Sequence, residues 1–536
     1  MKKRLISLFT AATLLVTALA ACNTDTDKGD TDDGIDGEEA RYEVDADVPA
    51  YKLDPKEDNK FTWYVNAEWW NTDWGNDTVT SVIQDDLNLD VEFIVGDDTK
   101  LNTFFASGEL PDIITIFDGG SKVAKQADEW ALPINKLAEK YDPYFFEVAR
   151  QETLDWYTLE DGNVYGYPGY SNTKEDADNN YILPNTAFVI RKDVYEALGE
   201  PDMTTPENFV NTLKEIKAEF PDLIPFGSNP MTDNDGSLGA DLQNYLGVPR
   251  VTEDGSWYDR VMDDDYQTWL RTLNHAYRAG GISDDNFSDD GTIHEEKVST
   301  GQYATIFVGG TPQRSGSLQN WYSENEDAQY IAIDGPMSLS GNEPAFPYGL
   351  SGWPVTYITK QCNDPIKAIE MYTYLLTDEA GILVTYGVEG ETYEVNEDGK
   401  IELLPEVEKM KQEDNDKFKK VYRLTEFFLF GHDRFLQYGD TELPAMEQIN
   451  AWGREQKQVP DLTENIGPDE GTDEARNLSA IMTDWYNTIV SMIRADSDEE
   501  FDQLLEEHKQ FREDNGWEDI VKVYNEKTEE NVSKLS

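Results

Sequence analysis

Hydrophobic residues gather in short runs over the first third of the chain, with polar turns between the runs. FTWYVNAEW, which begins at Phe61, is dense in aromatic and β-branched residues and predicts a strand. LDVEFIVG (89–96) and DIITIF (112–117) predict two further strands, with a helix that ends near Gly108 between them. Strands that alternate with helices in this way favour parallel sheets with helices packed on their faces.

Later in the chain, hydrophobic residues recur every three or four positions behind helix-start signals. Thr205 and Asp364 each precede a proline, the pattern of a capping residue followed by proline in the first helical turn. Ser497 and Glu500 have the spacing of a capping box. The predicted stripes are Phe209, Leu213, Ile216 and Phe220; Ile366, Ile369, Tyr372 and Leu376; Ile481, Trp485, Ile489 and Met492; and Phe501, Leu504 and Leu505. We expect all of them to face a core.

The N-terminus carries an export signal. Lys2, Lys3 and Arg4 precede an uncharged apolar stretch, which is shorter than the roughly 20 residues that a spanning helix needs. It ends in the sequence LAAC, which resembles the lipobox of bacterial lipoproteins. We therefore expect residues 1–21 to be a signal peptide and Cys22 to carry the lipid; the alternative is an ordinary signal peptide with Cys22 there by chance.

Residues 22–55 are polar, strongly acidic and poor in large apolar side chains. Such a segment buries too little surface to offset its ordering entropy, so we expect an acidic flexible tether. The rest of the chain has no second long apolar stretch, and we expect contact with the membrane through the lipid anchor only.

Composition narrows the choice of partners. Apolar residues make up 38% and aromatic residues 12%, as in globular proteins, but 108 acidic against 44 basic residues give a net charge of −64. Such a field repels nucleic acid and anionic surfaces, so we expect no nucleic-acid partner. An acidic solvated shell of this kind suits a salty or alkaline medium.

Several segments, in order, are similar to one known family. The segment 355–395 (VTYITKQCNDPIKAIEMYTYLLTDEAGILVTYGVEGETYEV) resembles the late part of family 1 extracellular solute-binding proteins, and more narrowly their large lipoprotein branch in Gram-positive carbohydrate importers (LplA-like). SGELPDIITIFDGG, YGYPGY with TAFVIRKDVYEALGEPDMTTPENFVNTLKEIK, TLNHAYRAGGISDDNF with STGQYATIFVGG, and DEEFDQLLEEHKQF fit the same family in the same order.

The resemblance implies an α/β, two-lobed periplasmic-binding-protein-like fold of type II, with a hinge of crossing strands and a ligand cleft between the lobes. We place lobe 1 at 56–185 and 345–415, and lobe 2 at 186–344 and 416–536. It further implies a lipid-anchored, extracellular substrate-binding component of an ABC importer. That component is a monomer that takes an oligosaccharide or other small solute by lobe closure and delivers it to the permease subunits.

A sugar site pairs carboxylates and amides with flat aromatic faces, because sugars have hydroxyl edges and C–H faces. Ligands also gather at strand carboxyl ends and at interfaces between domains. The substrate-binding residues that we predict on these grounds are Glu68, Trp69, Trp70, Asp73, Trp74, Asp118, Tyr167, Tyr170, Asn229, Arg314 and Trp353. The tryptophans can equally pack on strand ends, and Asp118 can equally cap a turn. Related sugar binders often carry a tryptophan where this chain has Thr311, so the stacking platform is expected in lobe 1.

Three other interpretations stay open. A glycoside-acting enzyme needs only two carboxylates, but HExxH, G-x-S-x-G and phosphate-loop motifs are absent from the sequence, and its four histidines are scattered. An adhesin or sensor ectodomain fits the same anchor. A structural calcium site is the third: the turns DNDG at Asp233 and SDDG at Ser288 look like calcium loops but fail the EF-hand spacing, which favours plain acidic turns. Apart from such an ion we expect no cofactor, and we expect no catalytic residue.

Overall fold

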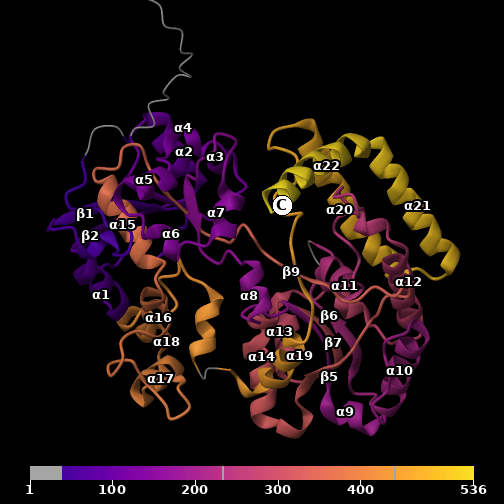
Figure 1. Cartoon of the computed structure of the whole chain (residues 1–536). Coiled ribbons are helices and arrows are strands. Elements are labelled where there is room, and N and C mark those ends of the chain that lie inside the picture. Colours follow the sequence, from indigo (N-terminus) through magenta and orange to yellow (C-terminus); the bar gives the residue numbers. More distant parts are fainter. Residues whose placement is uncertain (1–34, 36–38, 232–233, 440–441, 536) are drawn as a thin grey trace, which may run out of the picture.

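The computed structural model describes residue 35 and residues 39–231, 234–439 and 442–535, which fold into two lobes (Figure 1). The predicted signal peptide and the lipidation residue Cys22 lie outside the described residues. In the part of the chain that is described, the helices are all too short or too polar to cross a membrane.

Lobe 1 is built on a five-stranded sheet of order β2-β1-β3-β10-β4. Its strands are β1 (Asn59–Val65), β2 (Leu89–Val95), β3 (Ile113–Ile116), β4 (Gly166–Pro168) and β10 (Val355–Ile358). β1 runs parallel to β2 and β3, and β10 runs antiparallel to β3 and β4. The three strands predicted from the first hydrophobic runs are thus the parallel part of a mixed sheet.

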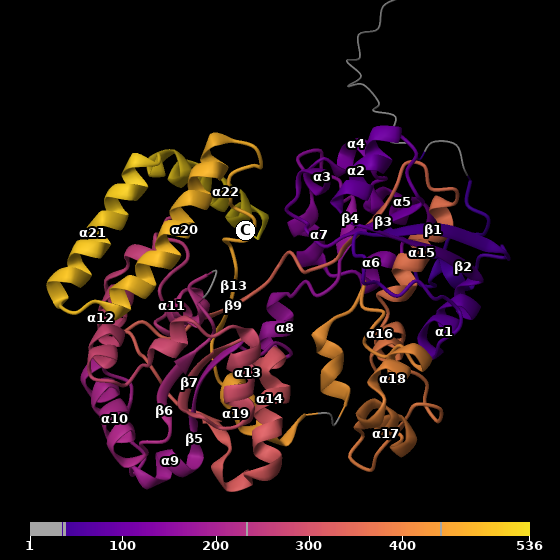
Figure 2. The ribbon, with the colours of Figure 1, turned by 180° about the vertical axis from the view of Figure 1, so that it is seen from behind.

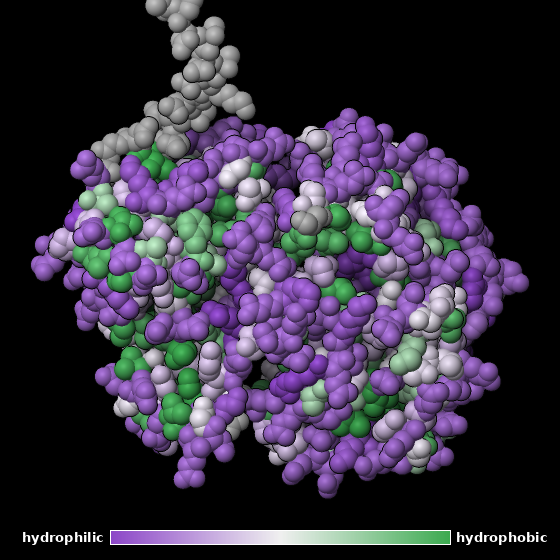
Figure 3. Space-filling view, in the orientation of Figure 1, coloured by the Kyte–Doolittle hydropathy of each residue, from purple (hydrophilic) through white to green (hydrophobic). Residues whose placement is uncertain are grey.

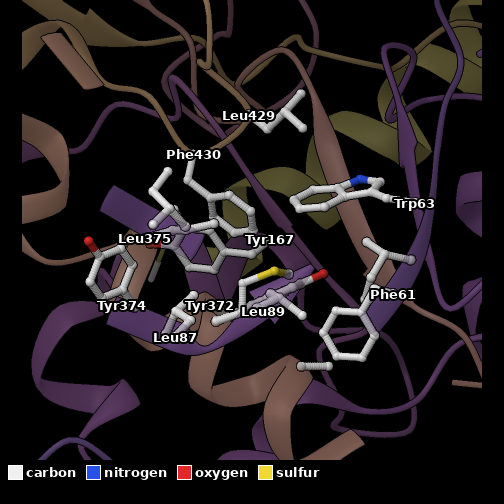
Figure 4. Packing of buried hydrophobic residues seen from close by; sticks show 14 of the residues in the cluster. Phe61, Trp63, Leu87, Leu89, Tyr167, Tyr372, Tyr374, Leu375, Leu429 and Phe430 are labelled. Carbon is white, nitrogen blue, oxygen red and sulfur yellow. The ribbon is translucent and has the colours of Figure 1, made fainter. Parts of the chain in front are cut away.

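Helices cover the faces of this sheet (Figure 1). Aromatic side chains take up much of the core between the helices and the sheet. Phe61 and Trp63 of β1 are fully buried and share one core with Tyr372 and Phe430, which come from much later in the chain (Figure 4). The helices of this lobe are α1 (Thr78–Leu87), α2 (Asp98–Ser107), α3 (Lys122–Lys125), α4 (Ala127–Trp130), α5 (Ile134–Tyr141), α6 (Phe145–Val148), α7 (Gln151–Tyr157), α15 (Pro365–Leu375), α16 (Asp378–Tyr386), α17 (Pro405–Glu413) and α18 (Asn415–Val421).

Lobe 2 carries a four-stranded sheet of order β6-β7-β5-β8. Its strands are β5 (Thr186–Arg191), β6 (Ile224–Ser228), β7 (Tyr303–Gly309) and β8 (Tyr330–Ala332). The pair β6–β7 is parallel, whereas β5 is antiparallel to both of its neighbours. The helices are α9 (Lys192–Ala197), α10 (Pro206–Glu219), α11 (Ala240–Tyr245), α12 (Asp264–Arg278), α13 (Gly291–Ser299), α14 (Thr311–Glu324), α19 (Glu447–Arg454), α20 (Asp473–Arg494), α21 (Asp498–Asp514) and α22 (Trp517–Lys534).

The predicted helix starts and stripes are confirmed in their main features. The side chains of Thr205, Asp364 and Ser497 accept hydrogen bonds from the backbone N–H groups of the first helical turn. The stripe of α20 is buried along its whole length, whereas Phe220, Leu376 and Leu504 at the edges of the other stripes are half-buried. These edge residues lie where a helix stripe meets solvent.

The chain passes between the lobes through segments that lie side by side in both views (Figures 1 and 2). The first leaves β4, contains α8 (Lys174–Asp178) and enters β5; the second joins β8 to β10 and contains β9 (Phe346–Tyr348), which pairs in parallel with β13 (Gln458–Pro460). At this hinge the guanidinium of Arg150 contacts the carboxylate of Asp176 at 2.7 Å and the ring of His432 at 3.1 Å. A small hairpin of β11 (Tyr393–Val395) and β12 (Ile401–Leu403) decorates lobe 1.

Two predicted boundaries need correction. Lobe 1 does not end at 415, because Phe418, Phe427 and Phe430 are buried in its core; FFLF (427–430) supplies apolar side chains that the sheet of lobe 1 covers. The flexible tether does not reach 55, because Tyr42 donates a hydrogen bond to the carbonyl of Tyr141 and Ala50 is buried. The described part of that segment, 39–55, packs on lobe 1.

Candidate functional site

Residues that directly follow or precede the strands of the lobe 1 sheet lie together at one edge of it, on the hinge side. Val355, the first residue of β10, pairs with Ile116 at the end of β3 and with Pro168 at the end of β4. β1 ends beside β3, with Val65 opposite Thr115. The loops after β1, β3 and β4 and the loop before β10 therefore meet at one edge, which is where ligands lie in open α/β sheets.

Three aromatic rings from these loops and a fourth from the segment 422–431 form a cluster, which we call the aromatic platform: Trp69, Phe117, Trp353 and Phe428. Trp353 stacks on Phe428 with ring centroids 5.4 Å apart and planes 6° apart, and Trp69 stacks on the same ring at 6.2 Å and 22°. Phe117 meets Trp353 at 5.0 Å and Trp69 at 5.5 Å, edge-on or tilted. Segments more than 300 residues apart in the chain thus build one surface.

The two tryptophans of the platform face solvent. Trp69 is 63% exposed and Trp353 is 49% exposed. An exposed indole forgoes the burial that makes tryptophan favourable in a fold, yet both rings are held in place by stacking rather than left loose. A rigid, exposed apolar face of this kind suits a ligand that has its own flat C–H face.

The loop beneath the platform is fixed by a buried arginine. Arg423 is fully buried and donates hydrogen bonds to the backbone carbonyls of Asn71 and Asp73, and its guanidinium lies 5.5 Å from the ring centroid of Trp70. Burial lowers the pKa of Arg423, and Asp77, 3.5 Å away, opposes that shift. The loop 68–74 therefore has a defined shape, because a buried cation needs all of its partners in position.

Three of the predicted cleft residues belong to the core instead. Trp70 and Trp74 are 4% and 8% exposed and pack on Phe93 and Phe427, and Trp74 donates from Nε1 to the carbonyl of Leu89. Tyr167 lies within β4, is buried, and its hydroxyl accepts a hydrogen bond from the backbone N–H of Arg150. These side chains fill the space between the sheet and the segment 422–431, which the sequence pattern assigned to the other lobe.

The predicted carboxylates lie at the surface. Glu68, Asp73 and Asp118 are exposed, and Glu68 and Asp118 adjoin Trp69 and Phe117 in the chain. Asp118 also accepts a hydrogen bond from the N–H of Gly120 at 2.9 Å, so it caps its turn as well. Tyr170 is half-buried with a positive φ of 56°, and its ring lies 6.4 Å from that of Phe428, at the border of the platform.

The residues predicted in lobe 2 are held by their own lobe. Asn229 donates from its amide to the carbonyl of Gly309 at 2.9 Å, and Arg314 forms an ion pair with Glu295. Thr311 is buried at the start of α14 and donates to the carbonyl of Pro184. Nothing in the structure brings these three side chains to the aromatic platform.

A pocket of about 770 Å³, which we call the inter-lobe pocket, opens between the lobes. Lobe 1 contributes the turn Gly119–Gly120, two residues after the platform residue Phe117, together with aromatic side chains on and beside α7 and the sheet. Lobe 2 contributes residues of the loop 465–469 and of α22. Its aromatic lining residues are Trp156, Tyr157, Tyr165 and Tyr357. A pocket of this size accommodates an extended small ligand.

A carboxylate of lobe 2 holds the loop that carries Trp353. Glu464 accepts hydrogen bonds from the N–H groups of Leu350 and Ser351 at 2.9 and 2.8 Å, and Tyr157 donates to the carbonyl of Ser351 at 2.5 Å. Burial raises the pKa of Glu464 to about 7. The position of Trp353 therefore depends on contacts from both lobes.

The two calcium-like turns give no evidence of a metal site. Asp233 lies outside the described residues, and in the second turn Asp290 caps α13 while Asp289 pairs with Lys297 at 2.5 Å. Across the residues that the structure describes, no three His, Cys, Asp or Glu side chains are close enough together to hold a metal ion.

Sequence reasoning missed Phe117, Phe428 and the residues of the inter-lobe pocket. Phe117 was identified as the end of a strand, and Phe428 lies in the run FFLFG (427–431), whose aromatic density before a glycine was the available signal. The pocket had no such signal, because α22 and the loop 465–469 approach lobe 1 only through the fold.

No family model and no curated protein matches this sequence. Solved structures share its fold: an extracellular solute-binding protein of Bifidobacterium longum subsp. infantis matches at 16% identity over 88% of this chain and 98% of its own, with a TM-score of 0.68. The S. pneumoniae ABC-transporter substrate binding protein FusA in complex with kestose matches at 17% over 89% and 100% (TM-score 0.61), and an alginate-binding protein without calcium ion at 16% over 88% and 98% (TM-score 0.60). The predicted two-lobed, periplasmic-binding-protein-like fold class is thereby confirmed.

Proposed function

We propose that this chain is the substrate-binding component of an ABC importer and captures an oligosaccharide between its two lobes without catalysing a reaction. The aromatic platform is the observation that carries the proposal, since two exposed, stacked tryptophans stand at the strand-end edge beside a pocket shared by both lobes. The similarity in fold to structures described as solute-binding proteins, one of them in complex with kestose, supports it.

The binding mode follows from the side chains present. The C–H faces of a sugar stack on Trp69 and Trp353, while the carboxylates of Glu68 and Asp118 accept hydrogen bonds from its hydroxyl groups. Closure of the lobes removes water from the sugar and from these side chains. Each hydrogen bond to a charged group then contributes about 1.5–3 kcal/mol. Asn229 and Arg314 of lobe 2 remain proposed contacts that would have to exchange their present partners.

The cellular setting belongs to the same proposal. Cys22, after cleavage of the signal peptide, carries a lipid that holds the protein on the extracellular face of the membrane, where it meets the permease subunits. One acyl chain binds membranes only marginally, so a stable anchor needs at least two. Labelling with a radioactive or alkyne fatty acid in cells tests this point, and Cys22→Ser should abolish the label.

A thermal-shift screen against plant, bacterial and host oligosaccharides tests the binding function. A ligand at 100 times its dissociation constant should stabilise the protein by about 2.7 kcal/mol. Trp69→Ala and Trp353→Ala should remove most of the shift, whereas Phe146→Ala, which truncates an exposed ring on α6 away from the platform, should not. A shift that survives both tryptophan variants contradicts the site, and release of sugar products during incubation contradicts the binding-protein function.

A further inference from the structure

The buried arginine beneath the aromatic platform is unavailable to a ligand, whereas two carboxylates beside the platform are exposed. Arg423 lies beneath the platform with no exposed surface and is engaged with Asn71, Asp73 and Asp77. Glu68 and Asp118, by contrast, are exposed next to the two ring-bearing loops. A ligand on the platform therefore meets negative charge from the protein.

In the inter-lobe pocket, carboxylates likewise outnumber cationic groups. Five carboxylates line it (Asp128, Glu160, Asp161, Asp469 and Glu530), against three ammonium groups. Two of these, Lys125 of lobe 1 and Lys527 of lobe 2, both contact Asp469 at 2.9 Å. The third, Lys534, lies over the ring of Trp156 at 5.1 Å.

Three arginines elsewhere on the two lobes are also paired. Arg150 at the hinge is bound by Asp176, Arg250 by Asp461, and Arg314 by Glu295. An acidic sugar that took one of these paired cations would leave a carboxylate without its partner, which is costly where the pair is partly buried.

We propose that the ligand is a neutral oligosaccharide and that the charge distribution of the site rejects saccharides bearing carboxylate or sulfate groups. This inference rests on the proposed function. Hydroxyl groups satisfy carboxylate acceptors, whereas a uronate adds a like charge near Glu68, Asp118 and the pocket acids. Like charges that are brought together in an interface repel each other, which weakens the binding of the wrong partner. The overall charge of −64 disfavours an anionic ligand further.

Matched ligand pairs test the inference. Each neutral oligosaccharide that binds the full protein is compared, by isothermal titration, with its derivative oxidised to the carboxylate at C6 of one residue. At low ionic strength we expect the acidic member of each pair to bind at least tenfold more weakly than the neutral member. The ratio of the two dissociation constants should be smaller in 1 M NaCl, where the Debye length is about 3 Å. Oligogalacturonate and alginate fragments should not bind.

Charge-neutralising variants locate the source of the discrimination. Glu68→Gln and Asp118→Asn should each narrow the ratio of the acidic to the neutral dissociation constant, which is taken within one variant so that a loss of hydrogen bonds common to both ligands cancels. Asp90→Asn, on an exposed position of β2, should leave that ratio unchanged. Equal or tighter binding of the acidic member overturns the inference but leaves the proposed function standing. If no saccharide of either series binds, the proposed function itself fails. If neither Glu68→Gln nor Asp118→Asn alters the ratio of the two dissociation constants, the assignment of the discrimination to these two carboxylates is wrong.

Discussion

Adjacent tryptophans of one loop have opposite roles at the scale of single residues. Trp69 faces solvent on the platform, whereas Trp70 turns into the core against Phe93 and Phe427. The two side chains diverge in the turn that follows β1, in which the N–H of Trp70 donates to the carbonyl of Ala67 at 3.2 Å. Sequence proximity to the site therefore does not identify which indole a ligand can reach.

Trp70→Ala should lower the free energy of unfolding by about 3–5 kcal/mol, because it leaves a cavity among packed aromatic rings. Trp69→Ala, at a 63% exposed position, should change it by less than about 1 kcal/mol. Urea denaturation of both variants checks the contrast. Equal losses would show that Trp69 is also part of the core.

Glu464 makes stability depend on pH through its raised pKa of about 7. The folded state holds a proton on this carboxyl group at pH values where the unfolded chain has released it, so the contribution is present below about pH 4.5 and is lost as pH rises through 7. Glu464→Gln should therefore stabilise the protein more at pH 8 than at pH 5, relative to the unchanged chain. Melting temperatures over that range check the sign; a gap that is constant with pH contradicts it.

At the scale of elements, the segment 39–56 is part of lobe 1. Arg41 contacts Asp54 at 2.7 Å and Asp364 at 2.9 Å, and Lys56 contacts Asp364 at 2.5 Å. Lys367 of α15, nearly fully buried, pairs with Asp54 and Glu370. This network of charges ties the segment to the start of α15, so that any flexible tether has to lie before it.

Arg41→Ala should destabilise the protein by about 3 kcal/mol, because Asp54 and Asp364 are buried and lose a shared partner. Arg476→Ala is the matched control: its guanidinium pairs with Asp473 on the exposed side of α20 and should contribute no more than about 1 kcal/mol. Chemical denaturation of the two variants distinguishes a docked segment from a tether, for which neither change would matter.

At the scale of the whole molecule, acidic residues outnumber basic ones by 108 to 44. Hydrophilic residues dominate the face shown in Figure 3, and the net charge of −64 opposes compaction through self-repulsion. Added salt screens this repulsion. The melting temperature should therefore rise from low to high NaCl concentration, and a flat or falling profile would contradict the interpretation of the acidic shell as an adaptation to salt.

Local sequence patterns determined much of the secondary structure of this protein and the faces that its helices and strands bury. Strand runs, helix stripes and capping residues follow from hydrophobic spacing and hydrogen-bonding chemistry within a few residues, so the parallel strands, α10, α15 and α20 and their buried faces were predictable. The ordered similarity of segments predicted the two-lobed fold. The net charge, likewise, follows from the counts of charged residues and requires no structure.

The tertiary structure alone decided where the segment after 415 packs, which tryptophans are exposed, and how the site is assembled. The platform joins Trp69 with Phe428, and the inter-lobe pocket joins Gly120 with Lys527, residues that meet only when the chain has crossed the hinge and returned. Burial is a property of the packed whole, because a side chain is covered by partners far away in sequence. A pattern read within a few residues of Trp69 or Trp70 contains no information about those partners.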